Sequence, residues 1–177
     1  MEKTALITGG SRSGKSSYAL ELARELARGH RLYFLATAQP LDDEMRLRIE
    51  HHRTRRPDDF ITLEEPIRLP ALIADLGGKA DVLVVDCLTL WISNLMGADS
   101  SDAAILAAAD ALSHTICEAA FPLVVVTDEV GSGVVPEYAA GRRFRDLLGW
   151  TNQKVANLAD QVILMVAGHP LVVKPRP

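Results

Sequence analysis

The stretch that decides the fold stands near the start of the chain and reads Thr4-Ala5-Leu6-Ile7-Thr8-Gly9-Gly10-Ser11-Arg12-Ser13-Gly14-Lys15-Ser16. It opens with an apolar, strand-like run, and an Ala- and Leu-rich segment from Lys15 to Arg28 follows as a predicted helix. Between them the sequence matches the phosphate-loop pattern Gly-x-x-x-x-Gly-Lys-Ser, in the strand-loop-helix context that this pattern requires. The stretch therefore predicts a P-loop fold.

The residues of this loop suit phosphate binding. Its glycines let backbone N–H groups turn inward around phosphate oxygens, and the N-terminus of the next helix adds its dipole. Lys15 is expected to contact the outer phosphates of a nucleoside triphosphate, and Ser16 to ligate Mg²⁺. The alternative is a glycine-rich turn without a ligand. The expected nucleotide contacts are Gly9, Gly10, Ser11, Arg12, Ser13, Gly14, Lys15, Ser16 and Ser17.

Outward from the loop, short apolar runs alternate with longer helical patterns. The runs are rich in Val, Ile and Leu without clean alternation, which is typical of strands covered on both faces. The predicted strands are 5–8, 32–37, 82–86, 123–128 and 162–167, with a short edge strand at 60–63 and a plausible last strand within 168–174. The predicted helices are 15–28, 42–56, 67–76, 88–96, 103–120 and 142–159, and the predicted loops are 97–102 and 131–138. Such alternation predicts a mostly parallel central sheet with helices on both faces.

Composition narrows the class of protein. A length of 177 residues with 48% hydrophobic residues fits one globular domain, 1–177. The net charge of −4 and the 5% aromatic content argue against a general nucleic-acid binder. Cys87 and Cys117 lack metal-ligand spacing. We see neither a signal peptide nor a membrane span, and expect a soluble, cytoplasmic protein.

Acidic residues end two of the predicted strands. Asp86 follows Val82–Val85, at the tip where P-loop enzymes place an acid that organises Mg²⁺, although it would also suit the N-cap of the next helix. Asp128 and Glu129 end a later strand in the same way. Either residue would serve as a second acid at the edge where ligands bind in open α/β folds.

The segment Asp42–Pro57 is the most unusual part of the chain. It has acids in its first turn and bases in its last, with the adjacent pair His51 and His52 between them. A solvated amphipathic helix with dipole-matched charge explains this composition. The alternative is an anion site, in which guanidinium groups hold a phosphate and one imidazole attacks phosphorus.

Several segments together resemble the bifunctional adenosylcobinamide kinase / adenosylcobinamide-phosphate guanylyltransferase family of cobalamin biosynthesis. The resemblance rests on the phosphate loop together with six further segments, and it covers essentially the whole chain. These segments are Ala36-Thr37-Ala38-Gln39, Asp42-Asp43-Glu44-Met45, Arg48-Ile49-Glu50-His51-His52-Arg53 with Arg56-Pro57, Val126-Thr127-Asp128-Glu129-Val130-Gly131 with Val135-Pro136, Arg143-Phe144-Arg145-Asp146, and Asn152-Gln153.

The resemblance implies a RecA-like fold, a trimeric assembly and two reactions. A nucleoside triphosphate phosphorylates adenosylcobinamide, and GTP then transfers GMP to the product, giving adenosylcobinamide-GDP. It implies that His51 carries GMP as a phosphoramidate. It places nucleotide contacts at Thr37, Ala38, Gln39, His52, Arg53, Thr54, Arg55, Glu64 and Asp86.

Two other functions fit parts of the sequence. A monofunctional P-loop kinase of a small molecule needs Lys15, Ser16 and an acid but no covalent histidine. A RecA-like regulatory or nucleic-acid-binding ATPase would use the basic helix to grip a phosphodiester backbone. The sequence leaves the donor, ATP or GTP, open. The corrinoid site is also left open: apolar surface near Trp91, Trp150 or Tyr138 is a candidate, and core or loop packing is the alternative for each of these residues.

Overall fold

A single sheet carries every strand of the part of the chain that the computed structural model describes, residues 4–54, 58–98 and 100–175. Its strands lie in the order β3-β2-β4-β5-β1-β6-β7. Their bounds are β1 (Thr4–Gly9), β2 (Leu32–Ala36), β3 (Phe60–Glu64), β4 (Val82–Asp86), β5 (Leu123–Val126), β6 (Gln161–Val166) and β7 (His169–Lys174). All neighbouring strands are parallel except β6 and β7, which are antiparallel. The predicted mostly parallel sheet is confirmed, with β3 at one edge.

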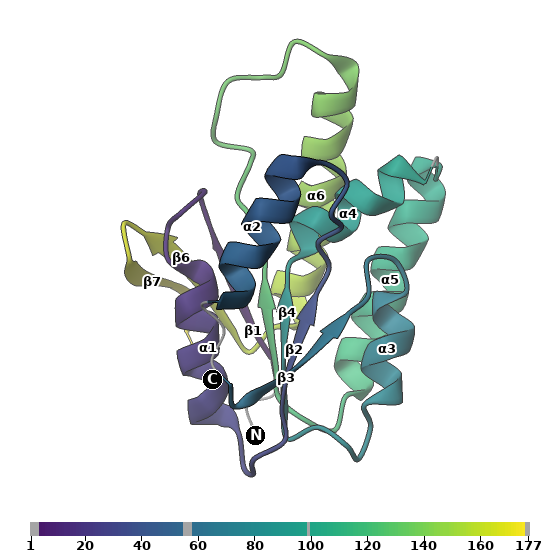
Figure 1. Ribbon diagram of the computed structural model, residues 1–177. Coiled ribbons are helices and arrows are strands. Elements are labelled where there is room, and N and C mark those ends of the chain that lie inside the picture. Colours follow the sequence, from purple (N-terminus) through teal and green to yellow (C-terminus); the bar gives the residue numbers. More distant parts are fainter. Residues whose placement is uncertain (1–3, 55–57, 99, 176–177) are drawn as a thin grey trace.

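Helices cover both faces of this sheet (Figure 1). They are α1 (Lys15–Leu26), α2 (Asp43–Thr54), α3 (Leu69–Asp75), α4 (Leu88–Gly97), α5 (Asp102–Glu118) and α6 (Ala139–Leu158). Apolar side chains of α1 pack on one face, against residues such as Phe34 and Val84. Side chains of α3, α4, α5 and α6 pack on the other, against Leu35 and Val85. Each predicted helix is present, with ends shifted by a few residues.

The burial of the central strands explains why apolar and polar residues do not alternate along them in the sequence. Val82, Leu83, Val84 and Val85 are all fully buried, because both faces of β4 are covered. The strand predicted to run to Asp128 instead ends at Val126. The residues after it lead into the loop 131–138, which lies outside regular structure as predicted.

The last two strands form a hairpin rather than another parallel unit. Ala167 and Gly168 connect them with φ values of 50° and 86°. Positive φ at both central residues is the signature of the tight turn that suits antiparallel strands. Pro170 is tolerated in β7 because this strand is at the edge of the sheet. Within the described ranges, no helix is both long and apolar enough to cross a bilayer.

Candidate functional site

The carboxyl ends of the parallel strands bring the predicted site residues to one edge of the sheet. Gly9 ends β1, Glu64 ends β3 and Asp86 ends β4. Thr37 directly follows β2, and Asp128 lies just beyond β5. Ligands of open α/β folds bind at this edge.

The phosphate loop runs from β1 into α1 with a backbone that only glycine tolerates at two positions. Gly9 has φ 149°, and a Cβ there would lie 2.6 Å from the carbonyl oxygen of Met165. Gly14 has φ 96° and is the N-cap of α1. No side chain caps this helix in the described structure, so its first N–H groups are free to bind an anion. The buried Ser13 hydroxyl also has no protein partner among the described residues. These features fit a phosphate cradle.

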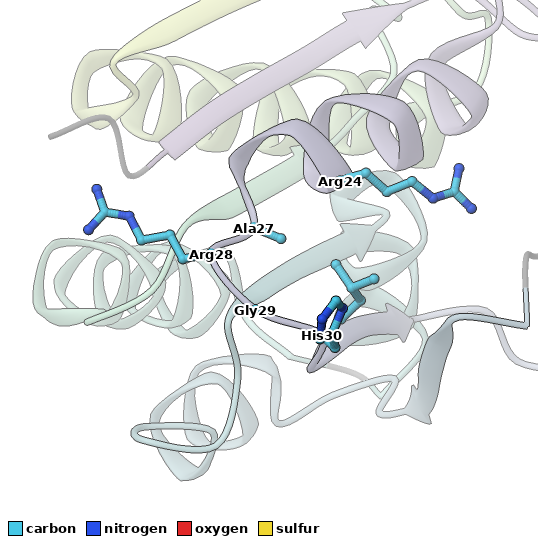
Figure 2. Close-up of a pocket in the computed structure, with 6 residues that line it drawn as sticks. Arg24, Ala27, Arg28, Gly29 and His30 are labelled. Carbon is cyan, nitrogen blue, oxygen red and sulfur yellow. The ribbon is translucent and has the colours of Figure 1, made fainter.

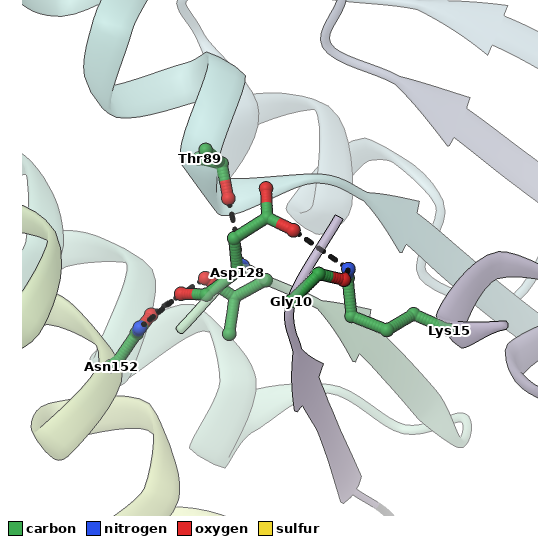
Figure 3. A network of polar contacts seen from close by, with 6 residues as sticks. Gly10, Lys15, Thr89, Asp128 and Asn152 are labelled. Carbon is green, nitrogen blue, oxygen red and sulfur yellow. Dashed lines mark hydrogen bonds and ion pairs between the residues drawn. The ribbon is translucent and has the colours of Figure 1, made fainter. Parts of the chain in front are cut away.

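Lys15 is folded back over the loop. Its ammonium group donates to the carbonyl oxygen of Gly10 at 2.7 Å and forms a salt bridge with Asp128 Oδ1, also at 2.7 Å (Figure 3). The lysine side chain is 9% exposed and the aspartate side chain 29%. Of the two acids that the sequence left open, Asp128 therefore belongs to the phosphate site.

Glu129 has a different role. Its carboxylate accepts the backbone N–H groups of Gly131 at 2.8 Å and Ser132 at 3.1 Å, closing the start of the loop 131–138. A hydrogen bond from the Ser132 side chain holds the pKa of Glu129 below its ordinary value. This carboxylate stabilises the loop.

Asp86 is half-buried at the end of β4 and is not a helix cap, because Cys87 occupies the N-cap position of α4. Ser16 is half-buried in the first turn of α1. A hydroxyl and a carboxylate are the oxygen ligands that Mg²⁺ prefers, so the two residues fit the predicted metal role chemically. Burial, and then the Asp86 carboxylate, raises the pKa of the Cys87 thiol to about 12. Cys87 therefore stays protonated at neutral pH and is no nucleophile.

Thr37 ties the ends of β2 and β4 together. Its hydroxyl donates to the carbonyl oxygen of Cys87 at 2.7 Å and accepts from the Cys87 N–H at 2.9 Å. Its own N–H donates to the Asp86 carbonyl oxygen at 3.1 Å, and its carbonyl accepts from Asn94 at 2.8 Å. Ala38 and Gln39 follow, half-buried at the same edge. Thr37 thus acts as the anchor of this segment.

His51 lies on the exposed helix α2, beyond the sheet edge (Figure 1). Asp42 caps the helix through a 2.7 Å hydrogen bond from the Met45 N–H. Every described side chain of α2 is exposed or half-buried, and Leu47 is 66% exposed. Thr54, at the end of α2, is exposed. The side chains of His52 and Arg53, and the whole of Arg55, lie outside the described residues.

The three aromatic candidates for the corrinoid site differ in how exposed their side chains are. Trp91 is fully buried and donates its indole N–H to the Ile67 carbonyl oxygen, so it has the core-packing role that the sequence also allowed. Trp150 and Tyr138 remain accessible, at 48% and 77% exposure.

A separate pocket lies at the other end of α1 (Figure 2). Its lining includes Arg24, Arg28 and His30, near the start of β2. Since α1 has 12 residues and a helix rises about 1.5 Å per residue, this pocket lies roughly 18 Å from the phosphate loop. It is therefore not part of the candidate site.

Comparison with known families decides the assignment. The model of the cobinamide kinase / cobinamide phosphate guanyltransferase family matches residues 5–173. The chain belongs to this family. It is similar to the bifunctional adenosylcobalamin biosynthesis protein CobP of Pseudomonas aeruginosa, with 41% identity over 97% of this chain and 98% of the relative. It is also similar to CobU of Escherichia coli, with 38% identity over 96% and 98%. As a member of the cobinamide kinase / cobinamide phosphate guanyltransferase family, the chain is an enzyme.

Solved structures agree on the fold. The ATPase domain of G40P matches 99% of this chain and 78% of its own length, with TM-score 0.56 and 11% identity. The flagellar accessory protein FlaH of Methanocaldococcus jannaschii matches 98% and 79%, with TM-score 0.54 and 12% identity. At this identity the likeness shows the fold alone, and it confirms the predicted RecA-like P-loop fold for this member of the cobinamide kinase family.

Proposed function

We propose that the enzyme phosphorylates adenosylcobinamide with ATP or GTP and then transfers GMP from GTP to adenosylcobinamide phosphate. Membership of the cobinamide kinase / cobinamide phosphate guanyltransferase family carries the proposal. The phosphate cradle at the start of α1, with Lys15 buried beside it, supports the triphosphate as the shared co-substrate of both reactions.

In the kinase step the loop holds the phosphates of the donor. The N–H groups at the start of α1 and the Lys15 ammonium face the phosphate oxygens, where they stabilise the charge of the transferring group. Ser16 and Asp86 would hold Mg²⁺, which supplies charge neutralisation between the outer phosphates. The loop recognises phosphates and not the base, so it accepts ATP and GTP alike.

In the guanylyl step the imidazole of His51 attacks the α-phosphorus of GTP. A nitrogen–phosphorus bond forms, and the bond from phosphorus to the pyrophosphate oxygen breaks. A phosphate oxygen of adenosylcobinamide phosphate then attacks the same phosphorus and releases the histidine. The exposed position of His51 on α2 leaves its ring accessible for both displacements.

The remaining predicted contacts would bind the nucleotide around this centre. They are Ala38 and Gln39 beside the anchor Thr37, Glu64 and Asp86 at the strand ends, and His52, Arg53, Thr54 and Arg55 after the nucleophile. Guanidinium groups of Arg53 and Arg55 would stabilise the phosphate under attack.

The test is GTP labelled at the α-phosphate. The wild-type protein should acquire a base-stable, acid-labile label that mass spectrometry maps to His51, and His51→Ala should lose the label while keeping kinase activity. His114→Ala is the control, because this exposed histidine lies on α5. A label that persists in His51→Ala would refute this residue as the nucleophile. A wild-type enzyme that phosphorylates the corrinoid without ever acquiring label would be a monofunctional kinase.

We also propose that the enzyme assembles as a homotrimer. The exposed apolar side chains of β7 support an assembly, since Leu171, Val172 and Val173 are 56%, 49% and 61% exposed. Sedimentation equilibrium of the purified enzyme measures the mass directly. A monomeric mass at assay concentrations would contradict the proposal.

A further inference from the structure

The salt bridge between Lys15 and Asp128 marks an acid that the phosphate-loop pattern does not include. The 2.7 Å contact joins the phosphate-loop lysine to a carboxylate that is distant in the sequence, just after β5. The lysine side chain is only 9% exposed. A bound triphosphate needs the same ammonium group for its outer phosphates. The Asp128 carboxylate therefore occupies a place beside the terminal phosphate of the donor.

Asp128 is held rigidly by its backbone. Its N–H donates to Thr89 Oγ1 at 2.8 Å, and its carbonyl oxygen accepts from Asn152 Nδ2 at 3.1 Å (Figure 3). The preceding Thr127 donates its hydroxyl to Asn152 Oδ1 at 2.7 Å and its N–H to the Ile7 carbonyl oxygen at 2.9 Å. Elements β1, α4 and α6 thus fix the position from which the carboxylate reaches into the site.

We propose that Asp128 is the general base of the kinase step. This inference rests on the proposed function. When the Lys15 ammonium turns to the donor phosphate, the carboxylate is released to accept the proton of the acceptor hydroxyl. The hydroxyl oxygen forms a bond to the γ-phosphorus, and the bond from that phosphorus to the bridging oxygen breaks. The nucleoside diphosphate leaves with the electron pair, and Asp128, 29% exposed, returns the proton to solvent.

The distances fit a hydroxyl between the carboxylate and the phosphate. An ammonium binds an anionic oxygen at about 2.8 Å. A phosphate oxygen bound to the Lys15 ammonium at its present position, 2.7 Å from Asp128 Oδ1, would therefore lie within roughly 5.5 Å of that carboxylate oxygen. A hydroxyl about 2.6–3.2 Å from its base and about 3–3.5 Å from phosphorus spans a similar gap. Glu129 is committed to its own loop and is not available for this role.

The experiment compares two reactions of the full-length Asp128→Asn variant. The kcat for phosphorylation of adenosylcobinamide should fall by about 100-fold or more, the usual contribution of a general base. The KM for ATP should not rise, because the loss of the carboxylate frees Lys15 for phosphate. GMP labelling of the protein by GTP should fall far less than the kinase kcat, since that step takes place at the α-phosphate.

Asp81→Asn is the matched control. Asp81 forms a salt bridge with Arg31 at the same 2.7 Å, just before β4 and so at the opposite edge of the sheet. This variant should keep wild-type kcat. If Asp128→Asn does not fold, Asp128→Glu carries the test. Displacing the carboxylate by about 1 Å should lower the kinase kcat by up to roughly 100-fold and lower GMP labelling far less.

Wild-type kcat in Asp128→Asn would overturn the proposal, as would wild-type kcat in Asp128→Glu should that variant be needed. A joint loss of phosphorylation and GMP labelling would also overturn it, because a structural or phosphate-binding role affects both reactions. A wild-type enzyme that phosphorylates no corrinoid would refute the proposed function and Asp128 with it. An active wild type with an equally active Asp128→Asn would refute only the role of Asp128.

Discussion

Replacing Thr37 by valine should destabilise the fold severely, although the two side chains have nearly the same shape. Thr37 is fully buried, and its hydroxyl makes both a 2.7 Å bond to the Cys87 carbonyl oxygen and a 2.9 Å bond from the Cys87 N–H. Valine offers neither a donor nor an acceptor. The substitution therefore leaves two backbone groups of a buried residue without these partners.

The expected cost follows from those two groups. An unsatisfied buried donor or acceptor costs about 1–3 kcal/mol, so Thr37→Val should lose about 2–6 kcal/mol. For a chain of this size each kcal/mol lowers the melting temperature by about 2–4 °C, which gives a fall of roughly 4–24 °C. Thr37→Ser keeps the hydroxyl and loses one methyl group, so it should cost only about 1 kcal/mol.

Urea unfolding followed by circular dichroism measures both variants. The midpoint of Thr37→Val should drop while the slope m stays constant, since the native state buries the same surface. Thr37→Ser should also keep the wild-type KM for GTP, because every polar group of Thr37 is bonded within the protein. A Thr37→Val variant as stable as Thr37→Ser would refute the assignment of Thr37 as the anchor of this segment.

Two further predictions concern the ends of strands β1 and β3. Burial raises the pKa of Glu65, but the backbone N–H groups of Arg68 and Ile67 outweigh it and hold this pKa below its usual value. The carboxylate should therefore stabilise the fold above the unfolded pKa of about 4.3 and lose that contribution as pH falls through the folded pKa. In urea titrations Glu65→Gln should be less stable than wild type by about 1 kcal/mol at pH 7, and the difference should vanish in acid; a pH-independent difference would contradict this. Gly9→Ala should cost more than about 2 kcal/mol, because its Cβ would meet the Met165 carbonyl oxygen at 2.6 Å, whereas Gly10→Ala meets nothing within 4 Å and should stay within about 0.5 kcal/mol. Equal melting temperatures for the two alanine variants would refute the reasoning.

Much of the fold could be predicted because its signals are local. Continuous Val and Leu runs such as Val82–Val85 predict buried strands, and the glycine pattern of the phosphate loop predicts the turn between β1 and α1. The antiparallel direction of the last strand, β7, was not predicted. The turn before it, Ala167-Gly168, carries only one glycine, and a plausible last strand in an α/β protein reads the same whether it runs parallel or antiparallel.

The candidate site was less predictable, because its contacts join residues far apart in the chain. Asp86 and Asp128 both follow apolar strands, and nothing in the local sequence distinguishes their roles. The burial of Trp91 and the hydrogen bond from the Thr37 hydroxyl to the Cys87 carbonyl oxygen also depend on neighbours from other elements. The adjacent histidines and their arginine neighbours suggested an anion site from the sequence alone, but only the resemblance to the family singled out His51 of the pair.

Strand order explains why the two acids should differ. β5 lies directly beside β1, and β4 lies one strand further away. The residues after β5 continue along β1, with the Thr127 N–H on the Ile7 carbonyl oxygen and the Glu129 N–H on the Gly9 carbonyl oxygen. Asp128 between them therefore meets Lys15.

On its other side the phosphate loop is supported by the last hairpin, where the Gly168 N–H donates to the Ser13 carbonyl oxygen at 3.0 Å. The loop is thus held between two segments from the second half of the chain. One is the acidic end of β5, and the other is the β6–β7 turn. A loop held on both sides can keep its N–H groups aimed at the phosphates in both proposed steps, in which one triphosphate reacts at its γ-phosphorus and another at its α-phosphorus. That is the requirement that a kinase and a nucleotidyl transfer place on one shared loop.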